Sequence, residues 1–208
     1  MPKPENPRNN PFKQHNKEHL LTDPVFLIGN GKSRKTFDLE KLRSKGTIIG
    51  CNALYRDFTP DILVAIDAKM LNEINNSKFG NKENELLICP SNRQVAVKNS
   101  LKWTAKKFNT SGCFAMMLIA SIMKPKICYM LGMDGFPGNV YDKTKNYSPN
   151  TLKNFTGVLR YYLEVLQSDH DTLFINVNEK DAWPEEAGKT GKYKFITYDD
   201  FELEVFEK

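Results

Sequence analysis

Short runs of apolar residues recur along the chain, and each is followed by a polar or helix-forming stretch. Each run has the length of a strand, contains β-branched residues and stays apolar at successive positions. This pattern is typical of strands covered on both faces, as in a parallel sheet, rather than of strands with one face in water. The runs occupy residues 25–30, 46–52, 61–67, 85–91, 126–134 and 172–178.

Helical patterns separate several of these runs, at residues 36–45, 67–76, 111–123 and 150–167. Strands that alternate with helices predict an α/β fold, here a single Rossmann-like domain with a mostly parallel sheet flanked by helices. Ligands of such sheets bind at the carboxyl ends of the strands. The polar residues at these ends are Asn30, Asn52, Asp67, Ser91 with Asn92, and Asp134.

The first residues of the chain have a different composition from the rest. Residues 1–22 are rich in Pro, Asn and Lys, which predicts a flexible arm that buries little apolar surface. Residues 23–208 are then expected to form one domain, because a chain of 208 residues with 40% hydrophobic residues is short for two cores. The arm lacks the apolar stretch of a secretion signal, and no run reaches the roughly 18–20 apolar residues of a membrane span. We therefore expect a cytoplasmic protein.

The charge distribution favours an anionic ligand. The net charge is +5, but the last ten residues hold five acids and one Lys, so the remainder carries +9. The basic residues are scattered, which favours an ordinary solvated surface over a nucleic-acid face, although DNA stays open as a partner. The four cysteines lie at the ends or starts of apolar runs, where buried free thiols are expected rather than a metal or disulfide framework.

The segment after the first run, Gly29-Asn30-Gly31-Lys32-Ser33, has a glycine-rich turn that could hold a phosphate. A P-loop would need Gly where Phe26 stands, and the dinucleotide fingerprint would need a third Gly where Arg34 stands. What remains is a strand that ends in a turn with exposed backbone N–H groups, followed by a helix start. Either a phosphate site or a plain strand-to-helix turn fits this pattern.

Four segments together resemble the small bacterial sialyltransferases, which use CMP-activated sialic acid, and related uncharacterised domains found beside glycan-modifying enzymes. The segments are LIGNGKSRKTFDLEKL, IIGCNALY, ELLICPSNRQ and NTSGCFAMMLIASIMKPKICYMLGMDGF. The resemblance covers roughly residues 25–141, and its most specific part is Thr110-Ser111-Gly112 before an apolar helix and a strand that ends in Gly-x-Asp. It implies the sialyltransferase-like variant of the GT-A type of fold.

The resemblance also implies roles for individual residues. It assigns contacts with the CMP portion to Asn30, Gly31, Ser33, Asn52, Ser111 and Gly112. Asp67 stands where the family has Asn, and a carboxylate there would suit ribose hydroxyls. Tyr141, with Tyr147 in reserve, corresponds to a tyrosine that stabilises the departing phosphate, whereas Phe136 replaces the other such tyrosine. The family's catalytic His has no counterpart between Val140 and Leu166, and Asp134 is our candidate base.

The sequence therefore predicts a metal-independent glycosyltransferase with a nucleotide-sugar donor, CMP-linked, and no further cofactor. Tyr141, Ser111 and the N–H groups at the helix start would neutralise the leaving phosphate. The acceptor is a saccharide or a modified base in DNA. A catalytically inactive nucleotide-binding protein and a phosphotransferase remain alternatives. Residues 169–171, Asp-His-Asp, precede a strand instead of ending one, so we expect a solvated turn there rather than a metal site.

Overall fold

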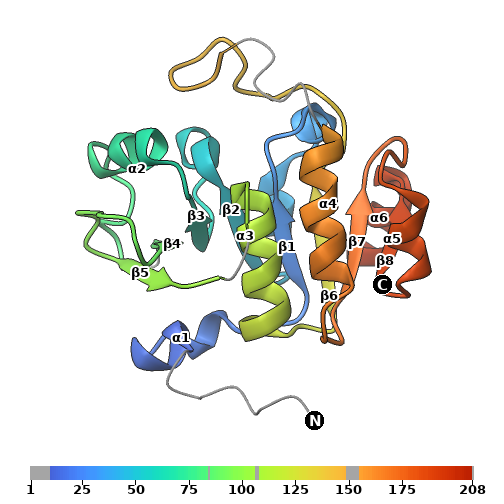
Figure 1. Ribbon diagram of the computed structural model, residues 1–208, viewed down its shortest axis with the longest axis horizontal. Coiled ribbons are helices and arrows are strands. Elements are labelled where there is room, and N and C mark those ends of the chain that lie inside the picture. The colour runs from blue at the N-terminus through green and yellow to red at the C-terminus, as the bar shows by residue number, and fades with distance from the viewer. Residues whose placement is uncertain (1–9, 84, 106–107, 149–154, 208) are drawn as a thin grey trace.

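The computed structural model describes residues 10–83, 85–105, 108–148 and 155–207. These residues form one eight-stranded sheet with the order β5-β4-β3-β2-β1-β6-β7-β8, and all neighbouring strands run parallel (Figure 1). The strands are β1 (Val25–Ile28), β2 (Thr47–Cys51), β3 (Ile62–Val64), β4 (Leu86–Pro90), β5 (Ser100–Trp103), β6 (Ile127–Leu131), β7 (Leu173–Val177) and β8 (Tyr193–Ile196).

The predicted α/β architecture is confirmed, and every predicted apolar run contains a strand. Strands β1, β2, β3 and β4 are buried along their whole length, as expected of strands with helices on both faces. Strands β5 and β8 were not predicted. Both lie at the edges of the sheet and include exposed positions, Lys102 and Lys194, so they do not form continuous apolar runs.

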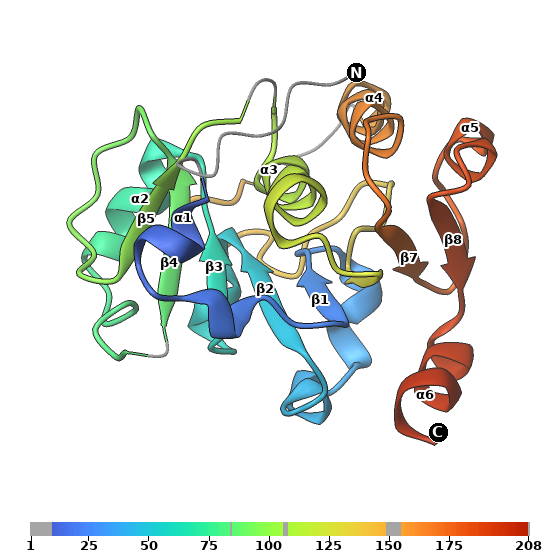
Figure 2. The same ribbon diagram turned by 90° about the horizontal axis from the view of Figure 1, so that it is seen from below.

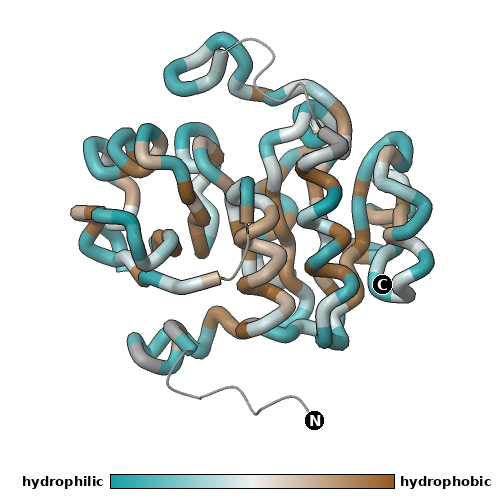
Figure 3. Tube along the Cα trace, viewed as in Figure 1, coloured by the Kyte–Doolittle hydropathy of each residue, from teal (hydrophilic) through white to brown (hydrophobic). Residues whose placement is uncertain are grey.

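Helices and turns cover both faces of the sheet (Figure 2). One face packs against α1 (Pro11–Gln14), α3 (Ser111–Leu118), α4 (Phe155–Leu166) and α5 (Glu185–Lys189). The other packs against the 3₁₀ turns η4 (Leu39–Leu42) and η5 (Asn52–Arg56) and the helices α2 (Ala68–Asn75) and α6 (Tyr198–Phe206). The most hydrophobic segments accordingly lie inside, and the outer turns are polar (Figure 3). None of the described helices is long and apolar enough to cross a membrane.

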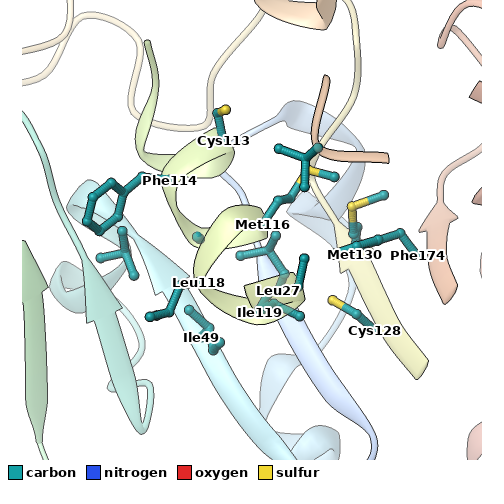
Figure 4. Packing of buried hydrophobic residues seen from close by; sticks show 14 of the residues in the cluster. Leu27, Ile49, Cys113, Phe114, Met116, Leu118, Ile119, Cys128, Met130 and Phe174 are labelled. Carbon is teal, nitrogen blue, oxygen red and sulfur yellow. The ribbon is translucent and has the colours of Figure 1, made fainter. Parts of the chain in front are cut away.

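Helix α3 is the central helix of the first face. It is apolar on nearly all sides because it packs against β2, β3 and α4, and the π turn η6 (Ile119–Met123) continues it. Phe114 and Leu118 of α3 and Ile119 of η6 are fully buried in the same cluster as Leu27 and Ile49 of the sheet (Figure 4). This packing fixes the start of α3 over the middle of the sheet.

The prediction of a helix at residues 36–45 was wrong. Two 3₁₀ turns replace it, η3 (Lys32–Thr36) and η4, and Phe37 between them is extended. This extended residue places its ring 5.6 Å from Phe201 and 5.7 Å from Tyr198 of α6, measured between ring centroids. Aromatic packing against α6 therefore accompanies the break in the helical pattern.

The flexible arm expected through residue 22 does not extend that far. Residues 10–22 contain α1 and the 3₁₀ turn η2 (Glu18–Leu20), and Phe12 is 0% exposed within the core cluster that includes α3. Asn10 caps α1 by accepting a hydrogen bond from the backbone N–H of Phe12 (3.0 Å). The segment is polar on average, so its composition did not indicate that one apolar residue, Phe12, attaches it to the core. Residues 1–9 lie outside the described residues.

The order of the strands reverses between β1 and β6. Strands β2 to β5 extend from one side of β1, and β6 to β8 extend from the other. The connections that leave the carboxyl ends of β1 and β6 therefore diverge to opposite sides, which opens a crevice where α/β proteins bind their ligands. In Figure 1 this edge faces upward, and α3 begins there.

Candidate functional site

A cavity with a volume of about 100 Å³ lies at this reversal point. Its lining comes from the ends of β1 and β2, the start of α3, the segment after β6, and Tyr162 of α4. The lining residues are 29–31, 51–52, 110–112, 132–136, 138–139 and Tyr162. Of the residues predicted for the site, the cavity brings together Asn30, Gly31, Asn52, Ser111, Gly112 and Asp134.

Glycines allow the extensions of β1 and β6 to remain paired beyond the strands. The N–H of Gly29 donates to the carbonyl of Leu131, and the N–H of Gly31 donates to the carbonyl of Gly132, both at 2.8 Å. A Cβ on Gly29 would collide with the carbonyl oxygen of Gly132, so the close approach requires glycine. The glycine pattern in this turn thus serves the pairing of the two central strands.

The turn that resembled a phosphate site already holds an anionic group of the protein. Asp134 accepts hydrogen bonds from the backbone N–H of Ser33 (3.1 Å) and from its hydroxyl, and the backbone N–H of Lys32 lies near enough to lower the pKa of the carboxyl group. The carboxyl group occupies the space where a Cβ on Gly31 would stand. The predicted phosphate contacts of Gly31 and Ser33 are therefore occupied by Asp134, and Ser33 does not line the cavity.

The surroundings of Asp134 have opposing effects on the pKa of its carboxyl group. Burial raises the pKa of this carboxyl group, while hydrogen bonds from Ser33, the backbone N–H of Lys32 and the nearby Arg34 counteract the increase. Asp134 is 3% exposed, and the amide of Asn178 lies 3.5 Å from its Oδ1. These contacts hold the carboxylate in place. Asp134 is therefore poorly placed for the role of general base that we predicted, because its oxygens already accept hydrogen bonds from the protein.

The start of α3 presents unused hydrogen-bond donors to the cavity. Thr110 is the N-cap, and its Oγ1 accepts from the N–H of Cys113 (3.1 Å) and lies 3.1 Å from the hydroxyl of Tyr162. The N–H groups of Ser111 and Gly112 have no acceptor in the described part of the chain. Free N–H groups at the positive end of a helix dipole attract anions. This is where the cavity can accept a phosphate.

Ser111 does not cap the helix but orients a neighbouring amide. Its hydroxyl donates to Oδ1 of Asn52 at 2.6 Å, and the serine is 2% exposed. Asn52 follows β2 with φ 52°, a left-handed conformation that is uncommon outside glycine and often found at functional sites. Ser111 thus fixes the orientation of the amide through Oδ1. The Nδ2 donor of Asn52 has no partner among the described residues.

Asn30 supplies an acceptor. Its Nδ2 donates to the carbonyl of Cys51 at 3.0 Å, which fixes the orientation of the amide. Its Oδ1 is buried and has no hydrogen-bond partner within residues 10–207 as described. A buried acceptor without a donor is costly, so a ligand or water that donates here would be stabilised. Asn30 and Asn52 both line the cavity, and each carries a polar atom, Oδ1 of Asn30 and Nδ2 of Asn52, without a partner among the described residues.

Tyr141 does not line the cavity. Its hydroxyl donates to Asp57 in a short hydrogen bond and accepts from Nη2 of Arg34 at 3.1 Å. Burial and the bond to Asp57 raise the pKa of this phenol. Arg34 is 5% exposed and also donates from Nε to the carbonyl of Gly29 at 2.8 Å. Tyr141 therefore supports the turn through Arg34, rather than facing a ligand as predicted.

Two other predicted residues are placed away from the cavity. Asp67 is exposed at the start of α2, beyond β3. Tyr147 is buried, with its hydroxyl 3.5 Å from Nδ2 of Asn30, and does not line the cavity. Phe136 does line it, and the ammonium of Lys180 lies 5.0 Å from the centre of the Phe136 ring. The segment after β6 therefore contributes an apolar ring to the cavity instead of a hydroxyl.

The described residues contain no cluster of three or more His, Cys, Asp or Glu side chains suited to a metal ion. Asp169 and Asp171 are exposed before β7, at the amino edge of the sheet, as predicted, but His170 between them is buried.

All four cysteines are buried and free, which confirms their predicted character.

Three residues of the site were not predicted in their roles: Arg34, Thr110 as the helix cap, and Tyr162. Arg34 was noticed only as a replacement for glycine in a fingerprint, and its position after a tight turn gave no sign that it is buried beside Gly132, directly after β6. Tyr162 is contributed by a distant helix, and only the packing of α4 on α3 brings it to the cavity. Comparisons of the chain with protein-family models, curated proteins and solved structures found no match.

Proposed function

We propose that the cavity binds a nucleotide and that the protein transfers a sugar from a nucleotide-activated donor. One observation carries this proposal: Ser111 and Gly112, whose backbone N–H groups have no acceptor among the described residues, line the cavity together with Asn30 and Asn52. The N–H groups suit a phosphate. Asn30 and Asn52 would pair with donors and acceptors of the nucleoside.

The chemistry follows from this placement. An acceptor hydroxyl attacks the anomeric carbon of the sugar and loses its proton to solvent. The bond from that carbon to the phosphate oxygen breaks, and the nucleotide leaves with the bonding electrons. Backbone N–H groups directed at the phosphate stabilise the charge that develops there. The resemblance of residues 25–141 to the sialyltransferases supports a CMP-linked sugar and the corresponding variant of the α/β fold. We propose that this step needs no metal.

A thermal-shift panel of CMP, CDP, UDP, GDP and ATP tests the binding step. A ligand at about 100 times its Kd stabilises the native state by about 2.7 kcal/mol, which raises Tm by about 5–10 °C for a chain of this size. The expected response is largest for CMP. Ser111→Ala should reduce the shift because it releases Asn52, whereas Ser91→Ala, an exposed serine at the end of β4, should not. Equal shifts in all three proteins would reject the site.

Donor turnover is the second test. Release of CMP from a CMP-sugar should persist in excess EDTA. Saccharide acceptors should accelerate it, and oligonucleotides are the alternative acceptor. Binding to DNA, if it occurs, should weaken steeply with salt because phosphate contacts release counterions. Turnover abolished by EDTA would contradict a metal-independent mechanism.

A second candidate is a nucleotide-binding protein without catalysis. The engagement of the Tyr141 hydroxyl with Arg34 and Asp57 favours it, as does the lack of a His among the described residues that line the cavity. Binding of a nucleotide without turnover of any CMP-sugar would support this candidate. A phosphotransferase is disfavoured because Asp134 occupies the turn in which its substrate's phosphates would sit.

A further inference from the structure

We propose that Asp134 is a specificity-determining residue, which makes the cavity select nucleoside monophosphates over the corresponding diphosphates. The inference rests on the proposed nucleotide binding. It adds a role for a residue that the proposed chemistry does not use. The negative charge of Asp134 is fixed beside the place where a second phosphate would have to lie.

The first step concerns the donors. Two of the sets of backbone N–H groups near the cavity begin a helical segment, one in the turn after β1 and the other at the start of α3. In the turn, the N–H of Ser33 already donates to Asp134, and the N–H of Lys32 lies near enough to lower the pKa of the same carboxyl group. At the start of α3, only the N–H groups of Ser111 and Gly112 are without an acceptor among the described residues. The donors left over at these two helical starts therefore suit one phosphate.

The second step concerns the charge. Asp134 is 3% exposed, lines the cavity and receives hydrogen bonds from Ser33 on both carboxylate oxygens. Arg34 lies near enough to Asp134 to lower the pKa of its carboxyl group, against the effect of burial. Burial raises the pKa of this carboxyl group, whereas the donors and the cation around it favour its ionised form. Within a cavity of about 100 Å³, a second phosphate would lie close to this charge.

The third step concerns mobility. Asp134 cannot move away easily, because its carboxyl group fills the space that the missing side chain of Gly31 leaves and because Asn178 approaches from β7. Like charges held at short range in a partly buried site repel strongly, since solvent screens them poorly. Repulsion by Asp134, and not only the size of the cavity, should therefore exclude the second phosphate.

The experiment measures Kd by calorimetry for matched pairs of nucleotides, CMP with CDP and UMP with UDP. The wild-type protein should bind the monophosphate at least about tenfold more tightly than the diphosphate, which corresponds to about 1.4 kcal/mol. Asp134→Asn keeps the shape of the side chain and removes its charge, so it should reduce this ratio about tenfold. Asp169→Asn removes a charge at the opposite edge of the sheet and should leave the ratio unchanged.

The possible results separate the two proposals. A ratio in folded Asp134→Asn equal to that of the wild type would overturn the inference and leave nucleotide binding intact. Wild-type protein that binds diphosphates as tightly as monophosphates would also overturn it, and this measurement needs no variant if Asp134→Asn fails to fold. Absence of binding by every nucleotide, in wild type and variant alike, would reject the proposed function and the inference with it.

Discussion

Phe12 provides a direct test of whether the N-terminal segment belongs to the folded body. The helix α1 has four residues, far fewer than an isolated helix needs for stability in water, so its order depends on docking. Phe12 is 0% exposed and lies in the core cluster that includes α3. Truncation of a fully buried Phe to Ala typically costs about 3–5 kcal/mol, because apolar contacts are lost and a cavity remains.

For a chain of this size, each kcal/mol shifts Tm by roughly 2–4 °C, so Phe12→Ala should lower Tm by roughly 6–20 °C. Deletion of residues 1–20 removes the same anchor and should lower Tm at least as much, contrary to the expectation for a flexible arm. Lys13→Ala changes an exposed neighbour in the same helix and should cost less than about 0.5 kcal/mol. Thermal unfolding followed by circular dichroism measures all three. A Phe12→Ala protein that melts together with Lys13→Ala would refute the reasoning.

Three further predictions follow from buried polar groups. Tyr141→Phe leaves Nη2 of Arg34 without its acceptor and should destabilise the fold by about 1–3 kcal/mol in denaturant titrations; unchanged stability would show that this bond contributes little. Burial raises the pKa of Cys51 to about 12 and that of Cys89 to about 11, so a thiol reagent should label the protein only as it unfolds, and rapid labelling of native protein would contradict this. Burial lowers the pKa of His170, so the folded state binds a proton less well than the unfolded chain. Stability should therefore fall below about pH 6.5, and less so in His170→Gln; parallel pH profiles of the two proteins would exclude this effect.

The central sheet could be predicted from the sequence because its strands are buried on both faces, which leaves a continuous apolar run in each. The edge strands β5 and β8 could not, because one side of each meets solvent and polar residues interrupt the run. The N-terminal segment was misjudged for a related reason. Its composition is polar on average, whereas its packing depends on Phe12, a single residue that an average does not register.

The candidate site, like the fold, could be predicted only in part. Asn30, Asn52 and Ser111 could be predicted because strand ends and helix starts at the carboxyl edge of a parallel sheet must meet. The partners of each polar group could not be predicted. Whether the glycine turn faces a phosphate or a carboxylate depends on where Asp134 lies, and it comes from a strand about a hundred residues later in the chain. Tyr141 was misplaced because a resemblance gives the position of a residue but not the direction of its side chain.

The pairing of β1 with β6 has a consequence for how the protein reaches its native state. These two strands are neighbours in the sheet, yet most of the first half of the chain lies between them. Closing such a long loop costs entropy before any contact compensates for it, and parallel sheets with distant partners fold slowly. The cavity cannot exist until this pair forms, since its walls come from both strand ends. The gain of ligand affinity during refolding should therefore follow the slowest phase, and partly folded chains should remain unable to bind.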